Sequence, residues 1–186
     1  MLRVEPSIRI ENVVASATLN QRIDLKAVVK GNPGVEYRPE RFPGLVFRIK
    51  RPKSAILIFS TGKMVCTGAK SEKEARKAIK KVVRELRKSG IIIPGKAEIK
   101  IVNMVASATL SGRIELEDSA YLLGKTMYEP EQFPGLIYRM DEPKVVILLF
   151  ASGRLVCTGA IKEEDVYKAV DKLHEKLKEK NLIYQE

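Results

Sequence analysis

The sequence has few of the residues on which most enzyme chemistry depends. It contains one histidine, His174, and two cysteines, Cys66 and Cys157, and neither cysteine has a partner at metal-ligand spacing. It also lacks a phosphate-binding glycine loop and a pair of carboxylates on an apolar face. We therefore expect no enzyme activity, no metal site and no cofactor. We expect His174 on an exposed flank of a helix and both thiols reduced and buried.

Long apolar runs are missing as well. The longest ones, such as residues 145–151, are far too short to cross a membrane, and the start MLRVEPSIRI has no signal-peptide core. We therefore expect a soluble intracellular protein without membrane contact. With 186 residues, of which 45% are hydrophobic, the chain can form one ordinary domain or two small ones.

Acidic residues are scarce in the first half of the chain. Residues 1–91 hold 21 Lys and Arg against 8 Asp and Glu, a net charge of +13, whereas residues 92–186 hold 13 against 15, a net charge of −2. The total of +11 favours an acidic partner such as nucleic acid. The uneven distribution indicates that the two halves have different surfaces.

The chain contains one internal repeat, at a constant offset of 91 positions. NVVASATL at residues 12–19 matches NMVASATL at residues 103–110 with seven identities in eight, and residues 37–69 match residues 128–160 with 19 identities in 33. A repeat of this length that occurs twice predicts two homologous lobes, residues 1–93 and 94–186, related by a pseudo-two-fold axis.

Hydrophobic periodicity predicts the same order of elements in each lobe. In the first lobe we expect a strand, a short helix, three closely spaced strands and a long helix, at residues 7–15, 23–29, 45–50, 55–60, 63–69 and from 71 onward. The counterparts begin with a strand at 98–106 and a helix pattern at 114–123. Ser71 and Glu74 form a capping-box pattern before the apolar stripe of the first long helix.

The strands are apolar on both faces, but the sequence supplies helices for only one of them. The long helix would cover Ile56, Ile58, Met64 and Cys66, which leaves a second, largely apolar face without cover. Such a patch is larger than a monomer usually exposes. This face shows Val46, Arg48, Leu57, Phe59, Val65 and Thr67 in the first lobe and Ile137, Arg139, Leu148, Phe150, Val156 and Thr158 in the second.

Polar groups complete this face. Asn12 and Asn103 fall on it if Val14 and Val105 do, because they alternate with them along the first strand of each lobe. Basic residues lie farther out and form a rim: Arg41, Arg48, Lys53, Lys63, Arg139, Lys144 and Arg154.

The duplicated segments N-V-V, R-F-P-G-L, L-I-F-S-T-G-K and V-C-T-G-A-K closely resemble the TATA-box-binding protein family over essentially the whole chain. The likeness of the two halves and the lack of a long N-terminal extension resemble the archaeal form. The resemblance implies an α+β saddle, with a curved ten-stranded antiparallel sheet and four helices on its convex face. It also implies a general transcription initiation factor that binds and bends TATA-box DNA through the minor groove.

The resemblance assigns roles to the residues of the open face. Its four intercalating rings match Phe42, Phe59, Phe133 and Phe150, and its minor-groove contacts match Asn12, Val14, Leu57, Val65, Thr67, Asn103, Val105, Leu148, Val156 and Thr158. Amide and hydroxyl donors beside aliphatic groups favour A·T pairs, which show only acceptors in the minor groove. If all seven rim cations contact phosphates, the slope of log affinity against log salt should be about −6, at about −0.9 per contact.

The resemblance also implies protein partners. Glu129 and Glu131 match the loop with which family members bind transcription factor B, which leads to recruitment of RNA polymerase; the first lobe has Arg38 and Glu40 there. The resemblance is also compatible with a homodimer that forms in the absence of DNA. We expect the protein in the cytoplasm of an archaeal cell with the nucleoid, or in the nucleus if the source is eukaryotic.

Plainer interpretations stay open for the same residues. Phe42 and Phe133 would then be core residues of F-P-G turns, Asn12 a turn residue, and the rim cations solvated surface charge. The basic run on the first long helix, from Lys73 to Lys88, is either a solvated face or a docking surface. A structural protein that pairs sheet to sheet would explain the apolar face but not its cationic rim.

Overall fold

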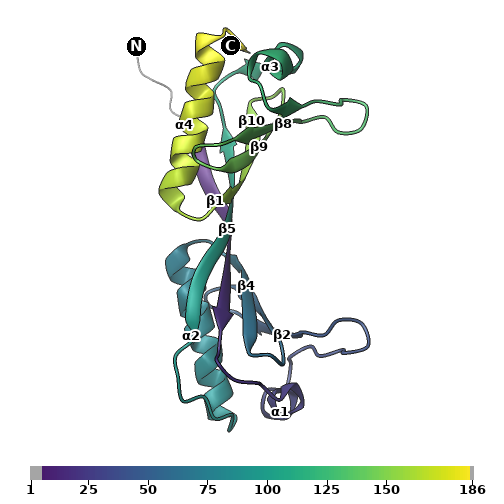
Figure 1. Cartoon of the computed structure of the whole chain (residues 1–186), viewed down its shortest axis with the longest axis vertical. Helices are drawn as coiled ribbons and strands as arrows, with labels where there is room; N and C mark the ends of the chain where they lie inside the picture. Colours follow the sequence, from purple (N-terminus) through teal and green to yellow (C-terminus); the bar gives the residue numbers. More distant parts are fainter. Residues whose placement is uncertain (1–5, 185–186) are drawn as a thin grey trace. The chain divides into compact units, whose positions relative to one another are not determined.

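The computed structural model describes residues 6–184, in which the elements of the two sequence repeats follow the same order (Figure 1). The first repeat comprises β1 (Ser7–Thr18), α1 (Leu25–Gly31), β2 (Leu45–Ile49), β3 (Ser54–Ile58), β4 (Lys63–Ala69) and α2 (Glu72–Lys88). The second comprises β5 (Glu98–Thr109), β6 (Arg113–Ile114), α3 (Leu116–Leu122), β7 (Thr126–Met127), β8 (Leu136–Met140), β9 (Val145–Leu149), β10 (Arg154–Ala160), α4 (Glu163–Glu179) and β11 (Ile183–Tyr184).

The chain folds into two compact units whose limits differ from those of the repeats. The N-terminal unit is Asn12–Val102, and the C-terminal unit runs from Asn103 onward and includes the described residues that precede Asn12. The sequence boundary at residues 93–94 marks the repeat, whereas the packing divides inside the long strands β1 and β5. Each of these two strands therefore begins in one unit and ends in the other.

The strand order is β2-β3-β4-β1-β5-β10-β9-β8-β7, and the strands within each unit pair antiparallel, with Leu57 opposite Val65 for example. The large sheet therefore has nine strands rather than the expected ten. The difference lies in the first repeat, where a single bridge between Glu36 and Val46 occupies the position of the β7–β8 pair. The short strands β6 and β11 form a separate sheet that the sequence did not predict.

The long helix α2 begins at an N-cap, as its capping-box pattern predicts. The Ser71 hydroxyl accepts a hydrogen bond from the Glu74 amide at 3.0 Å, and the Glu74 carboxylate accepts one from the Lys70 amide rather than from Ser71. The helix then buries its apolar stripe, including Ile79, Val82 and Leu86, against β3 and β4. Each such side chain contributes roughly 1.5–3 kcal/mol through burial.

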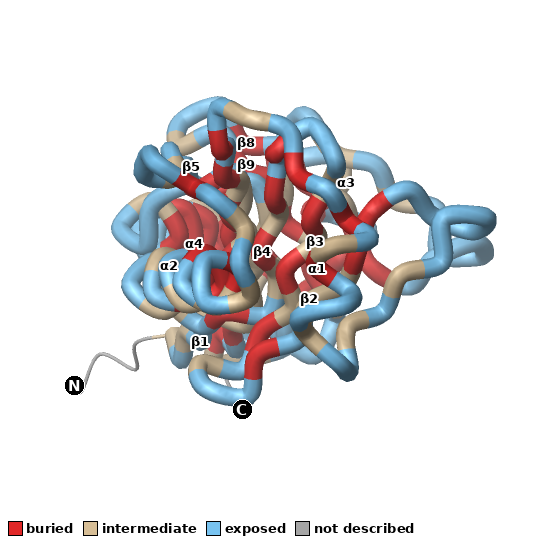
Figure 2. Tube along the Cα trace, turned by 90° about the horizontal axis from the view of Figure 1, so that it is seen from below, coloured by how far each residue is buried: buried red, intermediate tan, exposed pale blue. Residues whose placement is uncertain are grey.

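The strand face on which α2 packs is also apolar. Ile56 and Ile58 of β3 and Met64 and Cys66 of β4 are fully buried, as the two-residue period predicts. In the C-terminal unit α4 packs on β10 with the corresponding stripe. The buried residues of both long helices and their strands appear red in Figure 2.

The two short helices begin two residues later than expected, because their N-caps lie inside the predicted ranges. Asp24 caps α1 by accepting hydrogen bonds from the amides of Lys26 and Ala27, and α3 follows Glu115.

Both cysteines are free and fully buried, as expected, and burial raises the pKa of each thiol to about 11. In the described part of the chain, no helix is long and apolar enough to cross a membrane.

His174 is not on an exposed flank of α4, as the sequence suggested. Its side chain is only 4% exposed, because the flank beside Leu173 also faces the sheet, and its Nε2 atom has no hydrogen-bond partner among the described residues. Desolvation lowers the pKa of His174, and the charge of Lys178 lowers it further. Burial and the Lys178 charge thus both favour the neutral form of the histidine in the folded state.

The turn between β3 and β4 depends on Gly62. It has a φ of +91°, and its amide donates to the Phe59 carbonyl while its own carbonyl accepts from Leu19. A Cβ at this position would overlap the backbone oxygens of Leu19 and Gln21. The turn is consequently pressed against the chain that follows β1.

We predict that Gly62→Ala destabilises the protein more than the control Gly90→Ala. Both glycines have a positive φ, at which alanine costs about 1–2 kcal/mol, but a Cβ at Gly90 meets nothing within 4 Å. Denaturant titration should show a loss of about 1 kcal/mol for Gly90→Ala and at least twice that for Gly62→Ala. Equal losses would mean that the turn relaxes freely.

We also predict that the free energy of unfolding falls as the pH is lowered below about 6.5, the ordinary pKa of histidine. Because the folded-state pKa of His174 is depressed, the unfolded chain binds its proton first, so the stabilisation is complete above that pH and is lost toward the folded-state pKa. Denaturation at a series of pH values checks this. The variant His174→Leu should lose that part of the pH dependence; an unchanged pH profile would contradict the assignment.

Candidate nucleic-acid interface

Each unit has a second strand face that its long helix does not cover. In the N-terminal unit the side chains of Val14, Leu57 and Val65 are half-buried, whereas Val13, Ile56 and Cys66, their neighbours along the same strands, are buried. Val105, Leu148 and Val156 repeat the pattern in the C-terminal unit. We call these two surfaces the open faces. Their aliphatic content is the feature that the sequence predicted would require a partner.

A small polar cluster lies on the open face of the N-terminal unit. The Asn12 carbonyl oxygen accepts a hydrogen bond from the Gly68 amide at 2.7 Å, and its Nδ2 donates to the Thr67 hydroxyl oxygen at 3.2 Å. Because the Gly68 amide fixes which end of the amide group accepts, the Asn12 NH₂ is held toward Thr67. Its second hydrogen has no acceptor in the described part of the chain.

The C-terminal unit repeats the cluster with nearly the same distances. Gly159 donates to the Asn103 carbonyl oxygen at 2.7 Å, and Asn103 Nδ2 lies 3.2 Å from the Thr158 hydroxyl. The sequence predicted the asparagines and threonines but missed the two glycine amides that orient them. The sequence did contain a signal for these two glycines, because both copies of the V-C-T-G segment end in glycine.

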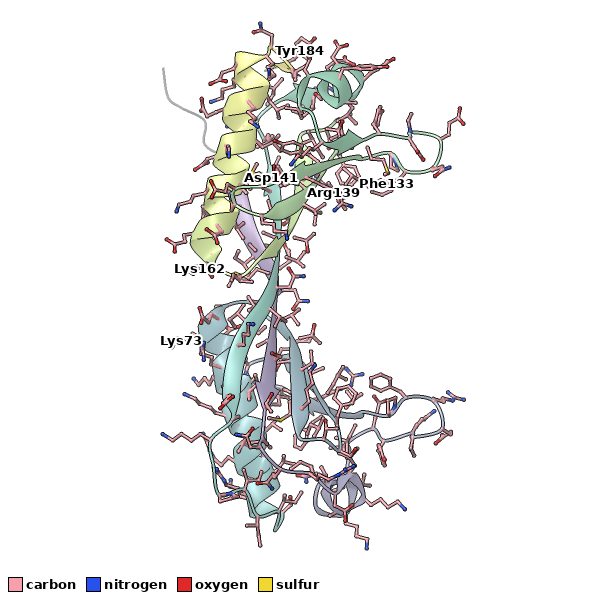
Figure 3. All side chains as sticks on the ribbon, in the orientation of Figure 1. Lys73, Phe133, Arg139, Asp141, Lys162 and Tyr184 are labelled. Atoms are coloured by element: carbon pink, nitrogen blue, oxygen red, sulfur yellow. The ribbon has the colours of Figure 1, made fainter. Side chains whose placement is uncertain are left out.

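Two phenylalanine pairs stand on the same side of the strands. Phe42 and Phe59 meet edge to face with ring centroids 5.8 Å apart, and Phe133 and Phe150 do the same at 5.8 Å. Phe42 is 42% exposed and Phe133 is 38% exposed, so neither is a core residue. This rules out the plainer interpretation of the two F-P-G turns. Figure 3 shows Phe133 on the side of its unit away from α4.

A glycine beneath each pair lets the rings lie close to the backbone. A Cβ at Gly44 would lie 2.7 Å from Phe42 Cε1 and 3.0 Å from Phe59 Cε1, and one at Gly135 would meet Phe133 and Phe150 at 2.8 and 3.0 Å. The backbone also fixes the exposed rings, because the amides of Phe42 and Phe133 donate to the carbonyls of Arg38 and Glu129 at 3.0 Å. Each ring pair is therefore held in position by its own turn.

All seven predicted rim cations are exposed. Arg48 forms an ion pair of 3.3 Å with Glu36, a surface contact of small energetic value. Its counterpart Arg139, labelled in Figure 3, has Met127 at the position equivalent to Glu36. The two units therefore present different charge patterns around similar open faces.

The sequence reasoning missed one cation. Arg9 of β1 lines a hollow of about 650 Å³ in the C-terminal unit together with Ser107, Phe150 and Arg154. Ser107 donates to the Glu11 carboxylate at 2.8 Å beside it. Arg9 gave no sequence signal beyond a charge in an alternating strand, and its equivalent in the other repeat is Lys100.

The loop before β8 carries Glu129 and Glu131, both exposed, and extends from the strands on the side away from α4 (Figure 1). The equivalent loop before β2 carries Arg38 and Glu40, also exposed. No group of His, Cys, Asp and Glu among residues 6–184 is arranged to hold a metal ion.

Comparisons with known proteins point to one family. The sequence profile described as "Transcription factor TFIID (or TATA-binding protein, TBP)" matches residues 7–89 and again residues 98–180. The TATA-box-binding protein of Pyrodictium occultum is 53% identical over 179 residues, which cover 96% of this chain and 90% of that protein. That of Methanothermobacter thermautotrophicus is 53% identical over 176 residues, with coverage of 95% and 97%. The solved structure "Methanococcus jannaschii TBP" has a TM-score of 0.84 at 51% identity and covers 93% of this chain and 99% of that one.

Proposed function

The chain belongs to the TATA-binding protein family, and on this premise we propose that its open faces bind the minor groove of A·T-rich promoter DNA and bend it. A member of this family is a DNA-binding factor of general transcription initiation and not an enzyme. The observation that carries the proposal is the duplicated arrangement of an oriented Asn–Thr cluster, half-exposed aliphatic side chains and a pair of fixed phenylalanines.

The polar clusters account for a preference for A·T pairs. The Asn12 and Asn103 amide groups are held as donors by Gly68 and Gly159, and an A·T pair offers only acceptors in the minor groove. A G·C pair adds the guanine amino group, a donor that meets the aliphatic side chains and the asparagine NH₂ without an acceptor. Because A·T and T·A look alike in this groove, their order is selected instead by the flexibility of TA steps.

The phenylalanine pairs supply the bending. We propose that Phe42 and Phe133, the more exposed members, enter between base steps with Phe59 and Phe150 beside them. The wedge mechanism is known from this family itself, and unstacking costs roughly a few kcal/mol per step. Contact between the opened groove and the aliphatic open faces offsets that cost. The rim cations Arg41, Arg48, Lys53, Lys63, Arg139, Lys144 and Arg154 would contact the flanking phosphates.

The same surface suggests the protein partners. We propose that transcription factor B binds the loop with Glu129 and Glu131 and that this complex recruits RNA polymerase near the nucleoid. Since the equivalent loop has Arg38 in place of Glu129, a factor that recognises this charge distinguishes the two units. We also propose that, without DNA, two copies of the chain cover each other's open faces in a homodimer, which an A·T-rich duplex would dissociate.

We predict selective binding to a labelled duplex with a TATA-like core over a duplex in which G·C pairs replace that core. Phe59→Ala and Phe150→Ala should each weaken binding by at least about tenfold, because each removes part of a wedge. The control is Phe47→Ala, since this half-buried ring alternates with the open-face positions Val46 and Arg48 on β2. Fluorescence anisotropy measures the affinities. Equal affinity for both duplexes, or no difference from the control, would refute the proposal.

For the protein partner, we predict that Glu131→Arg prevents formation of a complex with archaeal transcription factor B on the TATA duplex. The matched control is Glu40→Arg at the equivalent position of the other unit. A gel-shift assay should show normal duplex binding for both variants and a supershift only for the control and the unchanged protein. If both variants supershift, the acidic loop is not the contact.

A further inference from the structure

Two large apolar side chains are exposed at the end of α3 in the C-terminal unit. Tyr121 is 82% exposed and Leu122 is 51% exposed, although Leu116 and Ser119 of the same helix are buried. The backbone beside them is fixed, because the Thr126 hydroxyl donates to the Ala120 carbonyl at 2.5 Å. Neither exposed residue has a role in the DNA contacts proposed above. Apolar side chains that are grouped and exposed in this way indicate an interaction surface.

Carboxylates share the exposed surface of α3 with this pair. Glu117 lies four residues before Tyr121, and Asp118 lies four residues before Leu122, so each carboxylate is on the same helix face as an apolar side chain. Both carboxylates are exposed, and neither forms an ion pair among residues 6–184. The helix therefore presents two unpaired negative charges beside its apolar pair.

The equivalent helix of the N-terminal unit has a complementary surface. Like α3, α1 has seven residues, and its exposed side chains are Lys26, Val29 and Lys30, of which Val29 is 38% exposed. Lys26 occupies the position that Glu117 has in α3, and Lys30 occupies the position of Tyr121. Neither lysine has an ion-pair partner in the described part of the chain.

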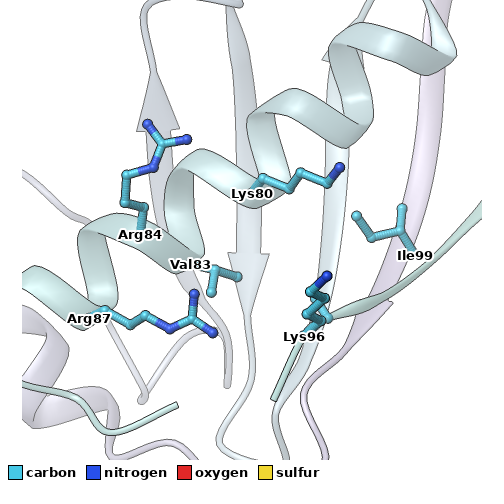
Figure 4. A pocket seen from close by; sticks show the side chains of 7 residues that line it. Lys80, Val83, Arg84, Arg87, Lys96 and Ile99 are labelled. Carbon is cyan, nitrogen blue, oxygen red and sulfur yellow. The ribbon is translucent and has the colours of Figure 1, made fainter. Parts of the chain in front are cut away.

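The charge of the two halves agrees with this complementarity. Residues 1–91 have a net charge of +13 and residues 92–186 a net charge of −2, so contact between unlike halves of two copies avoids the repulsion between two N-terminal halves. The other cationic helix of the N-terminal unit, α2, exposes none of its large apolar side chains along its described length. Figure 4 shows Lys80 and Arg84 of α2 close to Val83, which is buried. It is α1 that offers both cations and an exposed apolar side chain.

We infer that α3 of one copy binds α1 of a second copy of this chain. Tyr121 and Leu122 of the first copy lie against Val29 of the second, and the two carboxylates face its two lysines. Contact between two α3 helices would place like charges opposite each other. Because the two surfaces differ, the contact is head to tail and does not close at a dimer. The area of two short helices is small, so the association is weak and depends on a high local concentration.

The test is sedimentation equilibrium of the full chain over a series of protein concentrations at low salt. The unchanged protein should form species larger than a dimer as its concentration rises, and fewer of them at 1 M salt, where the Debye length is about 3 Å. K26E/K30E and E117K/D118K should each lower the association constant of these species at least about tenfold, because each places like charges opposite one another. None of these positions is on an open face, so a homodimer through the open faces would not respond.

The decisive sample is an equimolar mixture of the two double variants. It should regain the association within about threefold, since the acidic α1 of one variant meets the basic α3 of the other. Both variants keep a net positive charge, so attraction between whole molecules cannot restore it. The control K73E/K77E changes two exposed lysines of α2 by the same charge and should retain the association within about twofold.

The apolar part of the contact has its own variant. Tyr121→Ser should weaken the association at least about fivefold, whereas Tyr167→Ser on α4, where the tyrosine is 43% exposed, should leave it unchanged. The inference is overturned by an unchanged protein that never exceeds a dimer, by a mixture that does not regain association, or by equal losses in K73E/K77E and K26E/K30E. An association lost in Tyr121→Ser but intact in K26E/K30E would place a second α3 on this surface, which overturns it as well.

Discussion

The structure depends on an imbalance between strand faces and helices. A sheet whose strands are apolar on both faces needs cover on both, yet each unit has one long helix, which can bury only one face. α2 and α4 cover the side of Ile56 and Ile147, and the valines and leucines of the other side are left half-buried. In a free protein this exposure is unfavourable, and the same free energy becomes available when a ligand removes the face from water. In the DNA complex that we propose, burial of the open faces would therefore supply binding energy.

Small residues make these faces specific rather than merely apolar. Gly68 and Gly159 present backbone amides that fix the asparagine side chains, and Gly44 and Gly135 leave the space in which the phenylalanine rings pack. Both devices orient groups in the free protein, so the DNA binding that we propose would cost less entropy. A larger side chain at Gly44 would displace the rings without touching the ligand. Specificity here is a matter of backbone geometry in support of a few side chains.

The sequence predicted the features that follow from periodicity and duplication. The strand faces, the Ser71 cap and the burial of both cysteines are confirmed, because each depends on local pattern or on simple burial. The burial of His174 was not predicted, since a histidine next to a leucine lies at the edge of a helical stripe and only packing decides its side. The single bridge between Glu36 and Val46 was not predicted either, because one pair of backbone hydrogen bonds leaves no periodic pattern in the sequence. The residue roles that we propose for the interface came from the resemblance, whereas the hydrogen bonds from the glycine amides to Asn12 and Asn103 were visible only in the structure.

The division of the chain inside β1 and β5 has a consequence for a single copy of the repeat. Residues 6–11 pack with the unit that begins at Asn103, where Glu11 accepts the hydrogen bond from Ser107, and residues up to Val102 pack with the other unit. A single copy of the repeat would thus keep the first part of its long strand without a neighbour of its own. One copy alone would need a second chain to supply the segment that packs against this strand. In the duplicated chain that segment is covalently attached, and the two copies carry different charges.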